Sequence, residues 1–273
     1  MKFCKILFVL FFYVLFSGIV FASDIELSAD NGLEWDQNNM TISAVKNASI
    51  TRDKLNLTSD KITVKYRNRN KKLSKNSTEI FMIIAEGNVF VISPKEQINS
   101  DYMEYNLDTG IILIKSYGKP IKMKAHDVNI LAYGNIIYYE QKNYAIVNKA
   151  EVIHSGRSLL SDVMKLEFDK ISTNIKNKSN IGLGLSKITA TGNLTIKDKL
   201  EVLTGDVAIY DNKTGLVSID GNVRLSRGGG SKLQGGKIEY NMKTGITKLL
   251  PDPAFGKVIG IFQSSNKKII KNE

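Results

Sequence analysis

The stretch Gly87-Asn88-Val89, followed by Tyr105-Asn106 and Thr109-Gly110, decides the fold of this chain because it is repeated. The same phrase returns as Gly192-Asn193-Leu194, Tyr210-Asp211 and Thr214-Gly215, with each part displaced by 105 positions, from 87 to 192. A third copy, Gly221-Asn222-Val223, Tyr240-Asn241 and Thr244-Gly245, follows about 30 residues after the second. A fixed period indicates a repeat protein, and the finer spacing predicts a unit of two strands with their turns.

Apolar and polar residues alternate within each unit, which is typical of strands with one buried face. The alternation is clearest in Ile62-Thr63-Val64-Lys65-Tyr66 and in Met164-Lys165-Leu166-Glu167-Phe168. After residue 22 no segment has a sustained helical period, and the Thr-Gly pairs mark tight turns at which glycine adopts a positive φ. We therefore expect a chain that is nearly all β.

Three architectures can be built from short two-strand units: a closed barrel, a propeller and an open stack of two facing sheets. Propeller blades need four strands and roughly forty residues, which is more than this unit supplies. A transmembrane barrel needs an apolar outer band, whereas one face of most strands here carries Lys, Arg, Glu and Asp. The pattern favours two facing antiparallel sheets with open ends and a slot between them.

Two polar segments, residues 67–77 and 172–187, occupy the same place in the two halves of the duplication. They are rich in Lys, Asn and Ser and have little apolar periodicity, so we expect surface loops. The duplication also aligns Trp35-Asp36-Gln37 with Tyr139-Glu140-Gln141.

The first residues have the pattern of a secretory signal. Lys2 and Lys5 precede an apolar run at 6–20, and Val20-Phe21-Ala22 supplies a small-residue cleavage site. We predict a signal peptide at 1–22, a repeat domain at 23–255 and a basic tail at 256–273. An uncleaved signal anchor is the competing interpretation, because the apolar run approaches the length that spans a bilayer.

Composition excludes several classes of function. The single cysteine, Cys4, lies in the predicted signal, so the exported chain has no disulfides and no thiolate metal sites. His126 and His154 lie in different repeats, and we expect no metal site and no cofactor. The net charge of +11 falls to +9 without Lys2 and Lys5, and the scattered basic residues give no nucleic-acid footprint. No catalytic triad or phosphate loop is present, so we expect no enzyme.

A family resemblance rests on Ala29-Asp30-Asn31-Gly32-Leu33-Glu34-Trp35-Asp36-Gln37, on Ala85-Glu86-Gly87-Asn88-Val89 and on the repeated phrases. In order and spacing these segments resemble the OstA-like family of lipopolysaccharide-transport proteins. They are most similar to its periplasmic bridge component, in the form that alphaproteobacteria carry. The resemblance covers residues 28–250, and the chain departs from the simplest members in its length and in the segments 67–77 and 172–187.

The resemblance implies an elongated β-jellyroll in the periplasm, a twisted pair of sheets that joins end to end with similar jellyrolls. It also implies that the slot accepts the acyl chains of lipid A, and that a bridge of such proteins carries lipopolysaccharide to the outer membrane without covalent chemistry. The implied partners are lipopolysaccharide, an LptC-like inner-membrane component, an LptD-like outer-membrane translocon and further copies in head-to-tail association.

Under this interpretation the inward apolar positions bind acyl chains. The candidate lipid-binding residues are Val64, Tyr66, Val89, Val91, Met103, Tyr105, Ile112, Ile114, Leu166, Phe168, Leu194, Ile196, Val217, Ile219, Val223 and Leu225. The competing interpretation is that these side chains fill a dry core, because any half-buried sheet needs alternating apolar residues.

Charged residues and end strands complete the hypothesis. Six cations either meet the phosphates of lipid A or lie on a solvated sheet face: Lys95, Lys122, Lys124, Arg157, Lys197 and Arg224. By strand addition, residues 39–43 are expected to meet the inner-membrane component, and residues 237–241 the next subunit or the translocon. Two alternative functions stay open: a membrane-anchored LptC-like component and an exported structural β-repeat protein.

Overall fold

The computed structural model describes residues 25–52, 54–71, 74–94, 96–125, 128–154, 156–175, 178–252 and 256–262. Within these ranges the chain forms eighteen strands and one short 3₁₀ turn, η1 (Glu140–Lys142). The strands are β1 (Glu26–Ser28), β2 (Leu33–Asp36), β3 (Thr41–Arg52), β4 (Leu55–Lys71), β5 (Ser74–Ile92), β6 (Glu96–Asn106), β7 (Ile111–Lys115), β8 (Ile121–Ala125), β9 (Val128–Ala132), β10 (Ile136–Tyr139), β11 (Tyr144–His154), β12 (Arg157–Ile175), β13 (Lys178–Asp198), β14 (Glu201–Asp211), β15 (Leu216–Arg227), β16 (Lys232–Asn241), β17 (Ile246–Leu250) and β18 (Ile259–Ile261).

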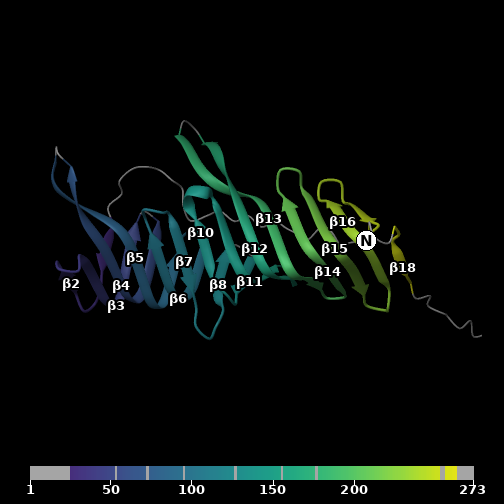
Figure 1. Ribbon diagram of the computed structural model, residues 1–273, viewed down its shortest axis with the longest axis horizontal. Coiled ribbons are helices and arrows are strands. Elements are labelled where there is room, and N and C mark those ends of the chain that lie inside the picture. The colour runs from purple at the N-terminus through teal and green to yellow at the C-terminus, as the bar shows by residue number, and fades with distance from the viewer. Residues whose placement is uncertain are drawn as a thin grey trace, which may run out of the picture.

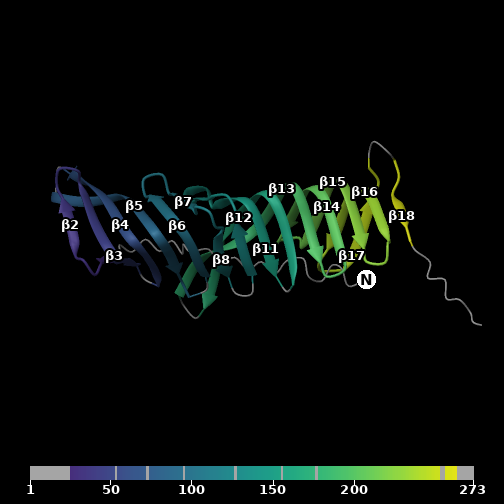
Figure 2. The same ribbon diagram turned by 90° about the horizontal axis from the view of Figure 1, so that it is seen from below.

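The strands pair antiparallel along an elongated molecule, in which the described strands run from β2 at one end to β18 at the other (Figures 1 and 2). Several long strands change partner midway. The first half of β6 pairs with β8 and its second half with β7, and β3, β11 and β16 divide in the same way. Each long strand therefore contributes to two layers: a first layer that includes β1, β8, β9 and β18, and a second layer that includes β2, β7, β10 and β17.

The Gly-Asn phrase lies where a strand passes from one layer to the other. In β13, Gly192 (φ 75°) and Asn193 (φ 44°) form a β-bulge, and Asn193 Nδ2 donates to Asp162 Oδ2 on β12 at 2.8 Å. A Cβ on Gly192 would lie 2.5 Å from the same oxygen, so a larger residue would force Asp162 to shift and would also be strained at this positive φ. The pairs Gly87-Asn88 and Gly221-Asn222 repeat this corner against Asp60 and Asp206.

The Tyr-Asn/Asp and Thr-Gly phrases build the turns at the end of the second layer. The side chains of Asn106, Asp211 and Asn241 each accept the backbone N–H of the threonine three residues later. The glycines that follow these threonines have φ values of 63°, 69° and 71°. Positive φ at these glycines is therefore confirmed, and backbone sterics account for them.

The core lies between the two layers. Apolar side chains from both layers form one buried cluster, which begins at Ala44 on β3 and continues to Tyr240 on β16. The outer faces carry the polar residues of the alternating pattern. The predicted all-β jellyroll of two facing antiparallel layers is confirmed.

The two polar segments are strands rather than surface loops. The β4–β5 hairpin continues as a paired ribbon to Lys71 opposite Ser74, and the β12–β13 hairpin continues to Ile175 opposite Lys178. The expectation of loops was wrong because backbone pairing prolongs a hairpin without needing an apolar face. Ion pairs tie each ribbon to a neighbouring turn: Arg67 to Asp108 at 2.8 Å, and Lys213 to Asp169 at 2.8 Å.

The structure shifts the alignment of the two halves by one residue. Asp36 pairs with Thr41 and Tyr139 with Tyr144, across connections of equal length. Trp35 therefore corresponds to Tyr138 and not to Tyr139. The difference matters because a shift of one residue moves a side chain to the opposite face of a sheet.

The free edges also differ from the expectation. Residues 39–43 include the start of β3, which lies between β2 and β4, and residues 237–241 belong to β16, which lies between β15 and β17. In the described residues the outermost strands are β1 and β2 at one end and β17 and β18 at the other. Alternation of apolar and polar residues identifies strands, but it does not show which strand lies at the free edge of a sheet.

The predicted signal at 1–22, Lys95, His126 and residues 263–273 of the predicted tail lie outside the described ranges. Among the described residues, no helix has the length and apolar character needed to cross a bilayer.

Candidate functional site

The inner faces of the two layers hold every predicted lipid-binding residue. Most are buried in the core, with Val223 at 0% and Leu166 at 1% exposure. Met103, Tyr105 and Leu225 are partly buried and pack against the same cluster. The inner face is therefore one continuous apolar track along the molecule, and it is closed in this structure.

Aromatic side chains line the inner face at the end of the second layer. They are Tyr66, Tyr105, Tyr138, Phe168, Tyr210 and Tyr240. Their hydroxyl groups take part in hydrogen bonds: Tyr105 donates to Glu140 Oε2 at 2.7 Å, Tyr210 donates to Asn212 Oδ1 at 2.9 Å, and Tyr66 accepts from Trp35 Nε1 at 2.6 Å. We call this set the aromatic row.

Burial changes the acidity of these hydroxyl groups. It raises the pKa of Tyr138 to about 12, with a further contribution from the charge of Glu140. Burial also raises the pKa of Tyr105, and its hydrogen bond to Glu140 acts in the same direction. Burial therefore favours the neutral form of the Tyr105 and Tyr138 phenols.

Charged side chains occupy the corresponding place at the end of the first layer. Arg157 Nε donates to Asp198 Oδ2 at 2.7 Å, and Arg227 Nε donates to Glu201 Oε1. Glu201 is only 8% exposed. The hydrogen bond from Arg157 lowers the pKa of Asp198, so this carboxylate stays ionised. We call these four residues the charged row.

The two rows belong to the same mouth of the molecule. Arg52, at the first-layer end of β3, is close enough to Tyr105 for its charge to lower the pKa of that hydroxyl, against the larger effect of burial. The buried core is therefore flanked by a tyrosine-rich edge and an ionic edge. Such a combination suits an amphipathic ligand, because tyrosine offers an apolar ring with a polar tip.

Sequence reasoning missed both rows as sets. The signal for the charged row was the two-residue alternation of the strands. Arg157 lies two residues before the buried Leu159, and Glu201 lies two residues before the buried Leu203, so each shares the inward face. At the other end, the repeated Tyr-Asn/Asp phrase carried Tyr210 and Tyr240. What the sequence did not show is that residues so far apart in the chain line one edge.

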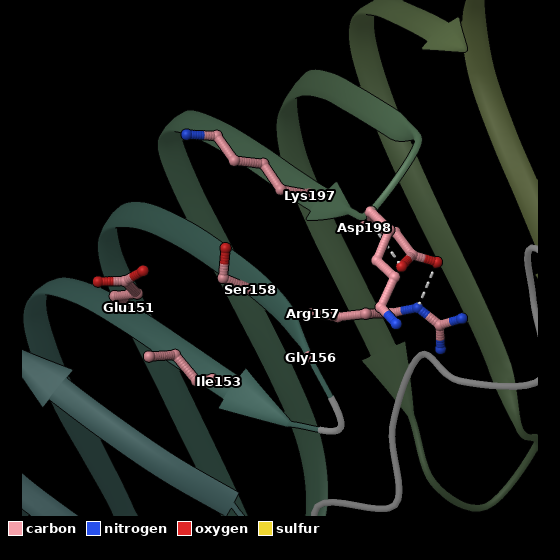
Figure 3. A pocket seen from close by; sticks show the side chains of 8 residues that line it. Glu151, Ile153, Gly156, Arg157, Ser158, Lys197 and Asp198 are labelled. Carbon is pink, nitrogen blue, oxygen red and sulfur yellow. Dashed lines mark hydrogen bonds and ion pairs between the residues drawn. The ribbon is translucent and has the colours of Figure 1, made fainter. Parts of the chain in front are cut away.

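The predicted phosphate-binding cations do not converge. Lys122, Lys124, Lys197 and Arg224 are exposed on outer faces, and only Arg157 turns inward. A shallow pocket of about 280 Å³ lies beside Arg157 and Lys197. Figure 3 shows the guanidinium of Arg157 against Asp198, while Lys197 points away from this ion pair. The cations beside this pocket therefore do not converge on one point at which a phosphate could bind.

The described residues offer no ready place for a metal ion. Within them, no three or more His, Cys, Asp and Glu side chains gather in a suitable group. The buried apolar interior with polar side chains at its edges suits an apolar ligand that carries polar groups at one end.

Comparisons with known proteins find a matching family model and similar solved structures. A family model described as LptA/(LptD N-terminal domain) LPS transport protein matches residues 74–246. Among solved structures, the chain is similar to LptH, described as the LptA homologous periplasmic component of the conserved lipopolysaccharide transport device from Pseudomonas aeruginosa. That match has 14% identity and a TM-score of 0.39, and it covers 50% of this chain and 95% of that chain. A comparison with curated proteins gives no match.

Proposed function

The chain belongs to the LptA/LptD N-terminal family of lipopolysaccharide-transport proteins, and from this premise we propose that it holds the acyl chains of lipid A between its two layers. In this proposal it acts in the periplasm, as part of a bridge between the inner and outer membranes. Membership of a transport family confirms the prediction that the chain is not an enzyme.

The observation that carries the proposal is the continuous apolar interior between two layers. Buried apolar side chains from Ala44 to Tyr240 form one cluster that runs along the described part of the molecule. Each methylene group that leaves water contributes about 0.8 kcal/mol, so several acyl chains offset the core packing that is disrupted when the layers separate. A lipid therefore enters by parting the layers at their mouth, and the core closes again when it leaves.

The mouth supplies the polar half of the proposed site. We place the sugar and phosphate groups of lipid A at the charged row, where Arg157 and Arg227 can exchange a carboxylate partner for a phosphate. The aromatic row on the other side would contact the boundary between sugar and acyl chain. This assignment replaces the expectation that exposed cations of the outer faces, such as Lys122 and Lys197, meet the phosphates of lipid A.

The two ends supply the proposed partner contacts. β1 and β2 present unpaired backbone at one end, and β17 and β18 do so at the other. Exposed strand edges accept another strand through main-chain hydrogen bonds. We assign the first end to an LptC-like inner-membrane component and the second to an LptD-like translocon, with further copies of the chain between them.

Photo-crosslinking in intact cells tests the lipid site. A photoreactive residue in place of Val91 or Ile196, both buried on the inner face, should capture lipopolysaccharide. Lys165 and Arg224 on the outer faces are the matched controls and should give several-fold fewer adducts. Equal or greater capture from the outer positions would defeat the interior site.

The same experiment separates the two alternative functions. A structural β-repeat protein would give no lipopolysaccharide adduct from any position. A membrane-anchored LptC-like component would give inner-face adducts but retain residues 1–22, which mass measurement of the protein from cells detects directly. Adducts from a chain that lacks the signal support the periplasmic bridge.

A further inference from the structure

The outer face of the first layer carries a row of exposed cations. Between β6 and β16, the cations on this face are Lys122, Lys124, Lys197, Arg224 and Lys232, which we call the cationic strip. Among the described residues of the same face and strands, the one acid is Glu151, and its carboxylate accepts a hydrogen bond from Tyr133 at 3.2 Å. This face is therefore strongly basic.

The outer face of the second layer pairs its charges instead. Lys165 Nζ lies 2.7 Å from Glu167 Oε1, and Lys237 Nζ lies 3.1 Å from Glu239 Oε1. In the part of the chain that the structure describes, no cation of the cationic strip makes an ion pair. A cation without a counter-ion on the protein leaves its field available to an anionic ligand.

The residues directly opposite these cations are uncharged. Lys124 lies between Gln97 on β6 and Asn129 on β9. Arg224 lies opposite Gln234 on β16. The three amide side chains are exposed, and none of them makes a hydrogen bond to a described residue. The cationic strip therefore combines positive charges with amide groups that are available to a ligand.

The cationic strip follows the long axis of the molecule. In the first layer the strands pair in the order β8, β9, β11, β12, β13, β14, β15 and β16 (Figure 1). Neighbouring strands lie about 4.8 Å apart, so the strip is about 34 Å long from Lys122 to Lys232. Cations spread over that length suit a ligand whose charges repeat along an extended chain.

We propose that the cationic strip binds an anionic polysaccharide that lies along the molecule and is distinct from the lipopolysaccharide cargo. The lysine and arginine side chains contact carboxylate groups of the polymer, and the amides exchange hydrogen bonds with its hydroxyl groups. The strip lies on the opposite face of the first layer from the apolar core, so its occupant does not compete for the interior. The inference does not depend on lipid binding.

A recess in the cationic strip favours a sugar over a flat surface. The shallow pocket beside Arg157 is also lined by Glu151, Ser158 and Lys197. Figure 3 shows Ser158 and Lys197 turned away from the ion pair of Arg157 with Asp198. A sugar ring offers both donors and acceptors to a cation, a hydroxyl and a carboxylate in one recess. A bilayer surface would leave several of these polar groups, and the exposed amides, without partners.

Binding to a defined polyanion tests the cationic strip. Polygalacturonate, a polysaccharide with a carboxylate on each sugar, is titrated with the protein at low salt in a calorimeter. The variant that combines Lys122→Gln, Lys197→Gln and Arg224→Gln should bind at least fivefold more weakly, and the affinity of the unaltered protein should fall as salt is added. No binding by the unaltered protein, or an unchanged affinity in the variant, would overturn the proposal.

A matched control separates the strip from net charge. The variant that combines Lys61→Gln, Lys65→Gln and Lys187→Gln removes the same charge from the outer face of the second layer, and its affinity should change less than twofold. Equal losses in the two variants would mean that binding follows net charge alone. Circular dichroism checks that both variants keep their strands.

Two further probes decide the class of ligand. Polyglutamate presents carboxylates without sugars, and phosphatidylglycerol vesicles present an anionic bilayer. At equal concentrations of negative charge, polygalacturonate should bind at least fivefold more tightly than either. Equal or tighter binding to polyglutamate would rule out recognition of the sugar, and equal or tighter binding to vesicles would reassign the strip to a membrane. Lipopolysaccharide capture from Val91 in the same variants reports on the proposed function separately.

Discussion

At the scale of single residues, the repeated phrase is a device for bending a strand. Asp162, Gly192 and Asn193 form a corner in which the glycine permits the bend, the asparagine takes the left-handed conformation and the aspartate holds the asparagine amide. Left-handed conformation costs a residue other than glycine about 1–2 kcal/mol, which asparagine partly recovers through its local hydrogen bond. The phrase recurs because each unit needs the same bend.

Alanine at two glycines tests this account. Gly192→Ala meets both an unfavourable φ and the carboxylate of Asp162, whereas Gly32→Ala meets an unfavourable φ (82°) with nothing within 4 Å. We expect the free energy of unfolding to fall by about 2–3 kcal/mol in the first variant and about 1 kcal/mol in the second. Urea denaturation of the two variants measures the difference, and equal losses would show that the carboxylate is irrelevant.

At the scale of elements, strand alternation puts different chemistry at the two ends of the same strands. The inner face is apolar along its middle, aromatic at the second-layer end and ionic at the first-layer end. Burial raises the pKa of the Tyr105 and Tyr138 phenols and favours their neutral form, and the pKa of Tyr138 is about 12. The layers consequently depend on those hydroxyl groups staying protonated.

Alkaline titration should therefore open the molecule. The folded pKa of Tyr138 lies above its ordinary value of 10, so its contribution to stability is complete below pH 10 and is lost as pH rises toward 12. Absorbance at 295 nm should show late tyrosine ionisation that coincides with loss of the strand signal in circular dichroism. Tyr138→Phe should move this loss to higher pH. Ionisation of all tyrosines near pH 10 without unfolding would contradict the role of burial.

At the scale of the whole molecule, an internal junction, where β7 pairs with β10 and β8 pairs with β9, joins two units of the same design into one rod. In repeat architectures each unit contacts only its neighbours, so the cooperativity of unfolding depends on the interfaces between units. Ile114 on β7, opposite Ile136 on β10, is central to that interface and is 5% exposed. Weakening this contact should uncouple the two units.

Ile114→Asp should convert one unfolding transition into two. A buried unpaired carboxylate costs about 3 kcal/mol or more, whereas Leu113→Asp on the outer face of the same strand serves as the control. In the unaltered protein, Trp35 fluorescence and circular dichroism should follow the same urea curve. In the variant, Trp35 should report the first unit alone and depart from circular dichroism. Coincident curves in Ile114→Asp would mean that the junction is not the weak point.

The sequence alone determined the repeat, the strand content, the facing layers and the inward residues, since period, alternation and turn chemistry are local properties of the chain. It placed Val89 and Ile196 inside correctly, because alternation assigns a face to each residue without reference to other strands. It also predicted the transport family through the order of its short phrases, which the family match confirms.

Only the tertiary structure decided where these strands end and what they meet. It turned two polar segments into paired ribbons, moved the free edges from β3 and β16 to β2 and β17, and corrected the partner of Trp35 from Tyr139 to Tyr138. It also paired Arg157 with Asp198 and Arg227 with Glu201 at the ionic edge of the core. The reason is physical: pairing and register depend on hydrogen bonds between strands that are distant in the sequence. Alternation along one strand shows which face a residue lies on, but it does not show which residue lies opposite.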